Sequence, residues 1–131
     1  MAVAGDWEAR LRKAIEAYNR GDYEAVVDLG SDDVELQRAS RAPESREVVR
    51  GREQVLEFFR PQVFDDQRLE LGEVEVGPDA ILAQTTFTAR GRGSGIPVEI
   101  ESWNVYRVRG DALSRIEIYN DAVEARAAAG L

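Results

Sequence analysis

Apolar residues recur at helical spacing near the start of the chain and alternate with polar residues over much of its second half. Over residues 6–20 the apolar side chains stand three or four positions apart, which predicts an amphipathic helix with one buried face. Gly21-Asp22 interrupts this pattern. Shorter helices are predicted over 23–29 and 51–60 and in the Ala-rich tail.

Shorter apolar runs with turn signals between them predict strands, and a loop is expected over 39–45. The predicted strands cover residues 34–38, 46–50, 68–76, 80–90, 96–109 and 112–121. The last two flank Gly110-Asp111, and such a two-residue connection indicates an antiparallel hairpin, because Gly tolerates a positive φ. Helices followed by antiparallel strands predict one α+β domain over residues 1–131, with helices covering one face of the sheet.

Unbroken pairing outward from Gly110-Asp111 predicts a mixed polar face and an apolar face for this hairpin. Asn104 and Glu117 share the polar face in this register, as a candidate pocket lining. The apolar face carries Trp103, Val105, Ile116 and Ile118. If exposed, that patch predicts a partner surface, most simply a homodimer; the alternative is that it forms the core and the polar face meets solvent.

The amino-acid composition narrows the range of possible reactions, cofactors and partners. The chain has no Cys and no His, which excludes thiol nucleophiles and removes the usual ligands of zinc, copper and haem iron, so we expect no metal and no cofactor. The net charge of −8 argues against a nucleic-acid partner. We see neither a signal peptide nor a stretch of membrane-spanning length, and therefore expect a cytoplasmic protein with no membrane partner.

Two kinds of candidate site residue remain. Glu117 is a candidate catalytic base beside the amide of Asn104; the plainer alternative is a hydrogen bond across the hairpin or to Arg115. The candidate ligand contacts are Tyr18, Phe59, Asn104, Tyr106 and Tyr119. Tyrosine hydroxyls anchor ligand oxygens while their rings form apolar walls, although core packing is the plainer explanation for any one of these tyrosines, above all for Tyr18 on the apolar stripe of its helix.

Three runs of residues resemble the SnoaL-like branch of the nuclear transport factor 2-like (NTF2-like) superfamily. They are AYNRGDYEAVVDLGSDDVEL, VVRGREQVLEFF and the stretch from GRGSG to the closing AGL. The resemblance covers nearly the whole chain. It implies a cystatin-like α+β cone, in which a strongly bent antiparallel sheet wraps around the N-terminal helices, and a homodimer formed through the outer sheet surface.

The same resemblance bears on catalysis. The positions of the tyrosine, base and acid of ketosteroid isomerases fall on Ala14, Arg38 and Asn104, which argues against isomerase chemistry of that kind. The expected function is binding of a small, largely apolar molecule with one or two oxygen functions in a cone-shaped pocket. One alternative is a lyase or isomerase, polyketide-cyclase-like or dehydratase-like, that uses Glu117 as base. Another is a non-catalytic dimerisation module.

Overall fold

The structure, a computed structural model, describes residues 6–38, 47–61 and 63–131, so the predicted loop 39–45 lies outside the described residues. The helices are α1 (Asp6–Asn19), α2 (Glu24–Val27), α3 (Arg52–Phe59) and α4 (Ala122–Ala128). Each forms within two or three residues of its predicted place, which confirms the helical pattern. In the described residues no helix is long and apolar enough to cross a lipid bilayer.

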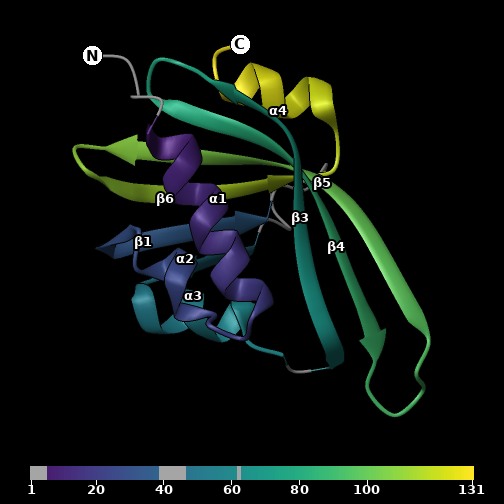
Figure 1. Cartoon of the computed structure of the whole chain (residues 1–131). Coiled ribbons are helices and arrows are strands. Elements are labelled where there is room, and N and C mark those ends of the chain that lie inside the picture. Colours follow the sequence, from purple (N-terminus) through teal and green to yellow (C-terminus); the bar gives the residue numbers. More distant parts are fainter. Residues whose placement is uncertain (1–5, 39–46, 62) are drawn as a thin grey trace.

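The strands form one curved sheet (Figure 1) in the order β2-β1-β6-β5-β4-β3. Their bounds are β1 (Gly30–Arg38), β2 (Glu47–Arg50), β3 (Phe64–Val76), β4 (Ala80–Gly91), β5 (Pro97–Arg109) and β6 (Ala112–Tyr119). The sheet is mixed, because β1 runs parallel to β6 while the other neighbours are antiparallel. The expectation of a wholly antiparallel sheet was wrong at this pair, because β1 and β6 are far apart in the sequence and no hairpin between them sets their relative direction.

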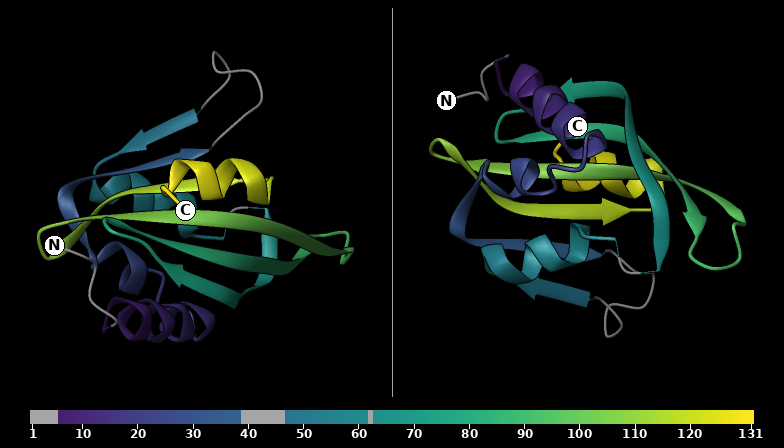
Figure 2. Two further views of the ribbon diagram at one scale, coloured as in Figure 1. Left: turned by 90° about the horizontal axis from the view of Figure 1, so that it is seen from above. Right: turned by 60° about the horizontal axis from the view of Figure 1, so that its bottom comes forward.

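Helices cover both faces of the sheet. The main core lies on the inner face, where the apolar stripe of α1 packs on Ile81, Tyr106 and Ile116. A smaller core lies on the outer face, where Ala125 and Ala129 pack on Leu82 and Val105. In Figure 2, α1 and α4 accordingly lie on opposite sides of the sheet. The prediction that helices cover one face missed α4, because a short Ala-rich tail does not reveal where it docks.

A β-bulge in β6 changes the predicted hairpin register. Arg109 pairs with Ala112 and Val108 with Leu113 as expected, but Arg107 pairs with Arg115, so Ser114 is an extra residue. The Ser114 hydroxyl donates a hydrogen bond to the Arg107 carbonyl oxygen across the bulge, at 3.4 Å. Since side chains alternate along a strand, one inserted residue turns the rest of β6 over.

The bulge overturns the predicted faces. Asn104 pairs with Ile118 and Val105 with Glu117, so Glu117 lies on the outer face and Asn104 on the inner face. The apolar patch predicted for a homodimer is divided in the same way. Ile116 and Ile118 belong to the main core, whereas Trp103 and Val105 pack beneath α4.

Asn19, the last residue of α1, ties this helix to the sheet. Its side-chain amide donates to the Leu69 carbonyl oxygen and accepts from the Leu69 N–H, both at 2.8 Å. Leu69 lies on β3, which is an edge strand. One side chain thus satisfies both backbone groups of an edge residue and fixes the end of α1 over β3.

Asn19→Ala is therefore expected to lower the free energy of unfolding by about 1–3 kcal/mol, because both Leu69 backbone groups lose their partner. Chemical denaturation measures the loss. Arg20→Ala, at the exposed neighbouring residue, is the matched control and should change stability by less than about 0.5 kcal/mol. Equal losses in both variants would contradict the anchoring role of Asn19.

Candidate functional site

Four uncharged polar side chains meet on the inner face of β4 and β5. They are Thr85, Ser102, Asn104 and Tyr106. Ser102 Oγ donates to Asn104 Oδ1 at 3.0 Å. Asn104 Nδ2 lies 3.4 Å from Thr85 Oγ1 and 3.5 Å from the Tyr106 hydroxyl oxygen. We call these four residues the inner polar cluster; Asn104, at its centre, is only 8% exposed.

Hydrogen bonding within the cluster is incomplete. Both contacts of the Asn104 amide are long, because an N–H···O bond is ordinarily about 2.9–3.0 Å. The Tyr106 hydroxyl accepts from Asn104, but no described residue accepts its proton. Burial raises the pKa of Tyr106, against a smaller opposing effect of the hydrogen bond from Asn104, so the phenol stays protonated. The cluster therefore holds hydrogen-bond donors that can serve a further acceptor.

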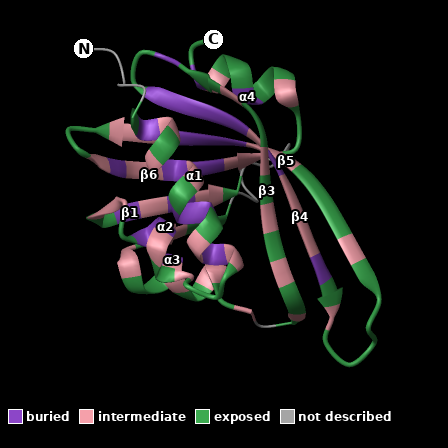
Figure 3. Cartoon of the chain, in the orientation of Figure 1, coloured by how far each residue is buried: buried purple, intermediate pink, exposed green. Residues whose placement is uncertain are grey.

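The inner face continues from this cluster along the free ends of β4 and β5. Phe87, Val98 and Ile100 follow the cluster on the same face, since Phe87 pairs with Ile100 and the alternation of these strands is unbroken. Phe87 and Val98 are half-buried and Ile100 is 48% exposed. Figure 3 shows burial concentrated under α1 and decreasing along this arm. Apolar surface that no helix covers thus borders the cluster.

Two further predicted site residues, Tyr18 and Phe59, meet on the helical side of the inner face. Their rings contact edge to face with centroids 6.2 Å apart. Gln67 Nε2 donates to the Tyr18 hydroxyl oxygen at 2.8 Å. Burial raises the pKa of Tyr18 to about 12. Tyr18 lies in the core with 2% of its surface exposed, whereas Phe59 is half-buried. Their roles in ligand contact stay predictions.

Glu117 and Tyr119 lie away from these residues, on the outer face. Arg107 Nε donates to Glu117 Oε2 at 2.5 Å, and Arg115 Nε lies 3.1 Å from the same oxygen. The Tyr119 hydroxyl donates to Glu117 Oε1 at 2.6 Å. Arg107 Nη2 also donates to the Ala128 carbonyl oxygen at the end of α4, at 2.6 Å. These charged and polar groups hold α4 on the sheet, and we call them the outer ion cluster.

The surroundings of Glu117 favour its ionised form. Burial alone would raise the pKa of its carboxyl group, but the hydrogen bonds from Arg107 and Tyr119 and the nearby guanidinium charges hold it below the ordinary value. A useful base near neutral pH needs a raised pKa instead. The expectation that Asn104 and Glu117 face one pocket was wrong, since the bulge separates them; the base role of Glu117 itself stays a prediction.

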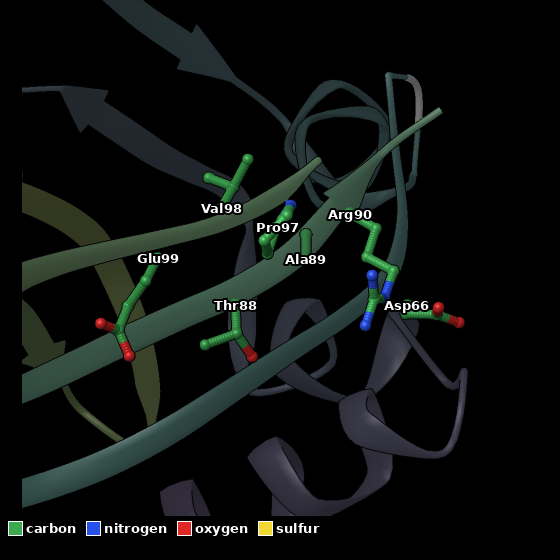
Figure 4. Close-up of a pocket in the computed structure, with 7 residues that line it drawn as sticks. All are labelled: Asp66, Thr88, Ala89, Arg90, Pro97, Val98 and Glu99. Carbon is green, nitrogen blue, oxygen red and sulfur yellow. The ribbon is translucent and has the colours of Figure 1, made fainter. Parts of the chain in front are cut away.

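An open depression of about 430 Å³ lies at the ends of β3, β4 and β5 that are far from α4, as Figure 4 shows in close-up. It is lined by Asp66, Thr88, Ala89, Arg90, Pro97, Val98 and Glu99. None of the predicted site residues lines it. Within the described residues, no group of three or more acidic side chains is placed to hold a metal ion.

The chain belongs to the SnoaL-like domain family, whose model matches residues 11–116. None of the curated proteins matches the chain. Among solved structures, an NTF2-like protein of unknown function from Burkholderia pseudomallei superimposes with a TM-score of 0.73 and 19% identity, over 95% of this chain and 97% of that one. These comparisons confirm the predicted NTF2-like α+β fold.

Two similar structures contain small molecules. A ketosteroid-isomerase-like protein from Catenulispora acidiphila, in complex with trimethylamine, has a TM-score of 0.71 and 15% identity over 92% of each chain. A Mycobacterium tuberculosis protein in complex with estradiol-17β-hemisuccinate has a TM-score of 0.69 and 18% identity, over 88% of this chain and 93% of that one. At these identities the likeness establishes the fold alone.

Sequence reasoning missed Thr85 and Ser102 as partners of Asn104. Alternation within each strand puts Thr85 on one face with Ala83 and Phe87, and Ser102 on one face with Asn104. It did not supply the pairing of β4 with β5, in which Ala83 lies opposite Asn104 and Thr85 opposite Ser102. A polar residue on an otherwise apolar inner face was the available signal.

Glu117→Gln is expected to lower the free energy of unfolding by about 2 kcal/mol near neutral pH, because it leaves Arg107 without its buried counter-charge. Since the folded-state pKa of Glu117 lies below the ordinary value of 4.5, this stabilisation is present above about pH 4.5 and is lost as the pH falls below it. Denaturation of both proteins across this range measures the difference.

The matched control is Glu8→Gln, which removes an exposed ion pair with Arg12 within α1 and should cost less than about 0.5 kcal/mol. A wild-type advantage over Glu117→Gln that grows as the solution is acidified would contradict the assignment of the outer ion cluster.

Proposed function

We propose that this protein binds a small, largely apolar molecule carrying one or two oxygen functions on the inner face of its sheet. The inner polar cluster holds a ligand oxygen through Asn104 and Tyr106. The ligand's apolar body lies on the apolar side chains that border this cluster on the same face of the sheet. The proposal names a class of ligand and no reaction.

The observation that carries this proposal is the unused donor capacity of a buried, uncharged cluster. Tyr106 is 3% exposed and Asn104 is 8% exposed, yet the Tyr106 proton has no acceptor among the described residues and the Asn104 amide makes only long contacts. Buried polar groups are ordinarily paired, so unused donors at the border of an apolar surface suit an incoming acceptor. A carbonyl or hydroxyl oxygen is the simplest such acceptor.

The comparisons support the ligand class in a general way. Proteins of this fold hold ligands as different as trimethylamine and a steroid hemisuccinate. The fold thus accommodates small organic molecules, while the residues that contact them differ from chain to chain.

A lyase or isomerase with Glu117 as base remains the enzymatic alternative. The geometry gives it less support than ligand binding, because the Glu117 carboxylate is held by two arginines and a tyrosine on the face opposite Asn104. A substrate on the inner face would have the sheet itself between its reacting atoms and this carboxylate.

A homodimer also remains a prediction, but it requires a surface other than the apolar patch expected from the sequence. Val105 and Ile116 are 0% and 2% exposed in the single chain. Trp103 is half-buried against the small core beneath α4. The patch is therefore covered within one chain.

Estradiol-17β-hemisuccinate is the probe for the binding proposal, and isothermal titration calorimetry measures its affinity. Asn104→Leu removes the amide from the inner face and is expected to weaken binding about tenfold, the loss of one good hydrogen bond. Gln84→Leu, on the outer face of β4 where Gln84 donates to Glu101, is the control and should bind as the wild type does. Equal affinity of Asn104→Leu and the wild type would sink the proposed site, provided both are folded by circular dichroism.

Trp103→Arg tests the dimer alternative. If Trp103 packs only against α4, the substitution should lower the free energy of unfolding by about 1–3 kcal/mol and leave the sedimentation coefficient unchanged. A wild-type dimer that this substitution converts to monomer would show that Trp103 lies in an interface after all.

A further inference from the structure

Arg38, the last residue of β1, places a cation at the edge of the inner face. Its Cα lies opposite that of Ile118, and Ile118 in turn lies opposite Asn104. The guanidinium carbon lies 5.3 Å from the centre of the Phe58 ring on α3. Arg38, Ile118 and Asn104 thus form a row across three neighbouring strands on one face of the sheet.

The charge of Arg38 is not neutralised by the described residues. Ten ion pairs occupy other arginines, and Arg38 is in none of them. The acidic neighbour is Glu47, which lies opposite Arg38 on β2 but forms no ion pair with it. The guanidinium carbon lies over the Phe58 ring instead, and a guanidinium in such a contact keeps N–H donors for an anion.

The spacing within this row defines the length of a ligand. Adjacent strands lie about 4.8 Å apart, so the backbones at Arg38 and Asn104 are separated by roughly 10 Å. Ile118, between them, is half-buried and apolar. A molecule reaching from Asn104 to Arg38 would therefore place an apolar body over Ile118, with a neutral oxygen at one end and an anion at the other.

We propose that the ligand of the inner face is a small apolar carboxylic acid, with its carboxylate on Arg38 and a hydroxyl or carbonyl oxygen on Asn104 and Tyr106. This inference rests on the proposed function and adds the charge of the ligand to it. A planar guanidinium matches a carboxylate through two parallel hydrogen bonds. The net charge of −8 repels anions in general, so acceptance of a carboxylate depends on this local cation.

The test compares 6-hydroxy-2-naphthoic acid with 6-hydroxy-2-naphthamide, two probes of the same shape that differ in charge. Binding is followed by their fluorescence. The wild type is expected to bind the acid about tenfold more tightly than the amide, because a charge-assisted hydrogen bond is stronger than a neutral one by about that factor in affinity. Arg38→Gln should weaken binding of the acid about tenfold and binding of the amide much less, so that the preference for the acid is lost. Glu47→Gln should raise the affinity for the acid, because it removes the competing carboxylate.

Arg68→Gln is the matched control, since Arg68 lies opposite Thr88 on the outer face and forms no ion pair with the described residues; it should keep the preference for the acid. Raising the ionic strength should weaken binding of the acid to the wild type and leave the amide unaffected, a readout that needs no variant.

Different results would overturn the role of Arg38 and the proposed function. Equal binding of acid and amide by the wild type, or equal weakening of both probes by Arg38→Gln, overturns the role of Arg38 while amide binding that depends on Asn104 sustains the proposed function. Absence of binding of either probe to the folded wild type overturns the carboxylic-acid proposal; the proposed function fails with it only if estradiol-17β-hemisuccinate is not bound either.

Discussion

One extra residue in β6 decides which side chains this protein presents inside its curved sheet. Ser114 interrupts the pairing of β5 with β6, and every residue of β6 beyond it faces the opposite way from an unbroken hairpin. Ile116 and Ile118 are thereby directed into the main core, and Glu117 is directed outward beneath α4. Without the bulge, two isoleucines would leave the core and a carboxylate would enter it, at a cost far greater than that of one disrupted pair.

The two faces consequently have different chemistry. On the outer face, Glu117 is surrounded by Arg107, Arg115 and Tyr119, and its hydrogen bonding is saturated. Such a cluster orients and holds α4, and it has little capacity left for a ligand. On the inner face the polar groups are neutral, buried and incompletely paired, and they adjoin uncovered apolar surface. The proposed recognition of a small molecule is therefore assigned to the face that carries Asn104 and Tyr106.

Much of this architecture could be predicted from the sequence, because periodicity depends on side chains close together in the chain. The helix over 6–20 and the faces of β4 follow from it, and the glycine of Gly110-Asp111 indicates the turn. The orientation of Glu117 could not be predicted, since a bulge arises from the energies of both faces at once and Ser114 has no distinctive signature. The docking of α4 and the parallel pairing of β1 with β6 depend on contacts distant in sequence. The inner polar cluster was found only in part for the same reason.

The register of β5 and β6 tests the account most directly, and backbone NMR measures it without any variant. The account predicts cross-strand nuclear Overhauser effects between Asn104 and Ile118 and between Tyr106 and Ile116. Effects that instead join Asn104 to Glu117 and Tyr106 to Arg115 would show an unbulged hairpin. Glu117 would then face inward beside Asn104, and the division of the sheet into an ion-paired outer face and a neutral inner face would be contradicted.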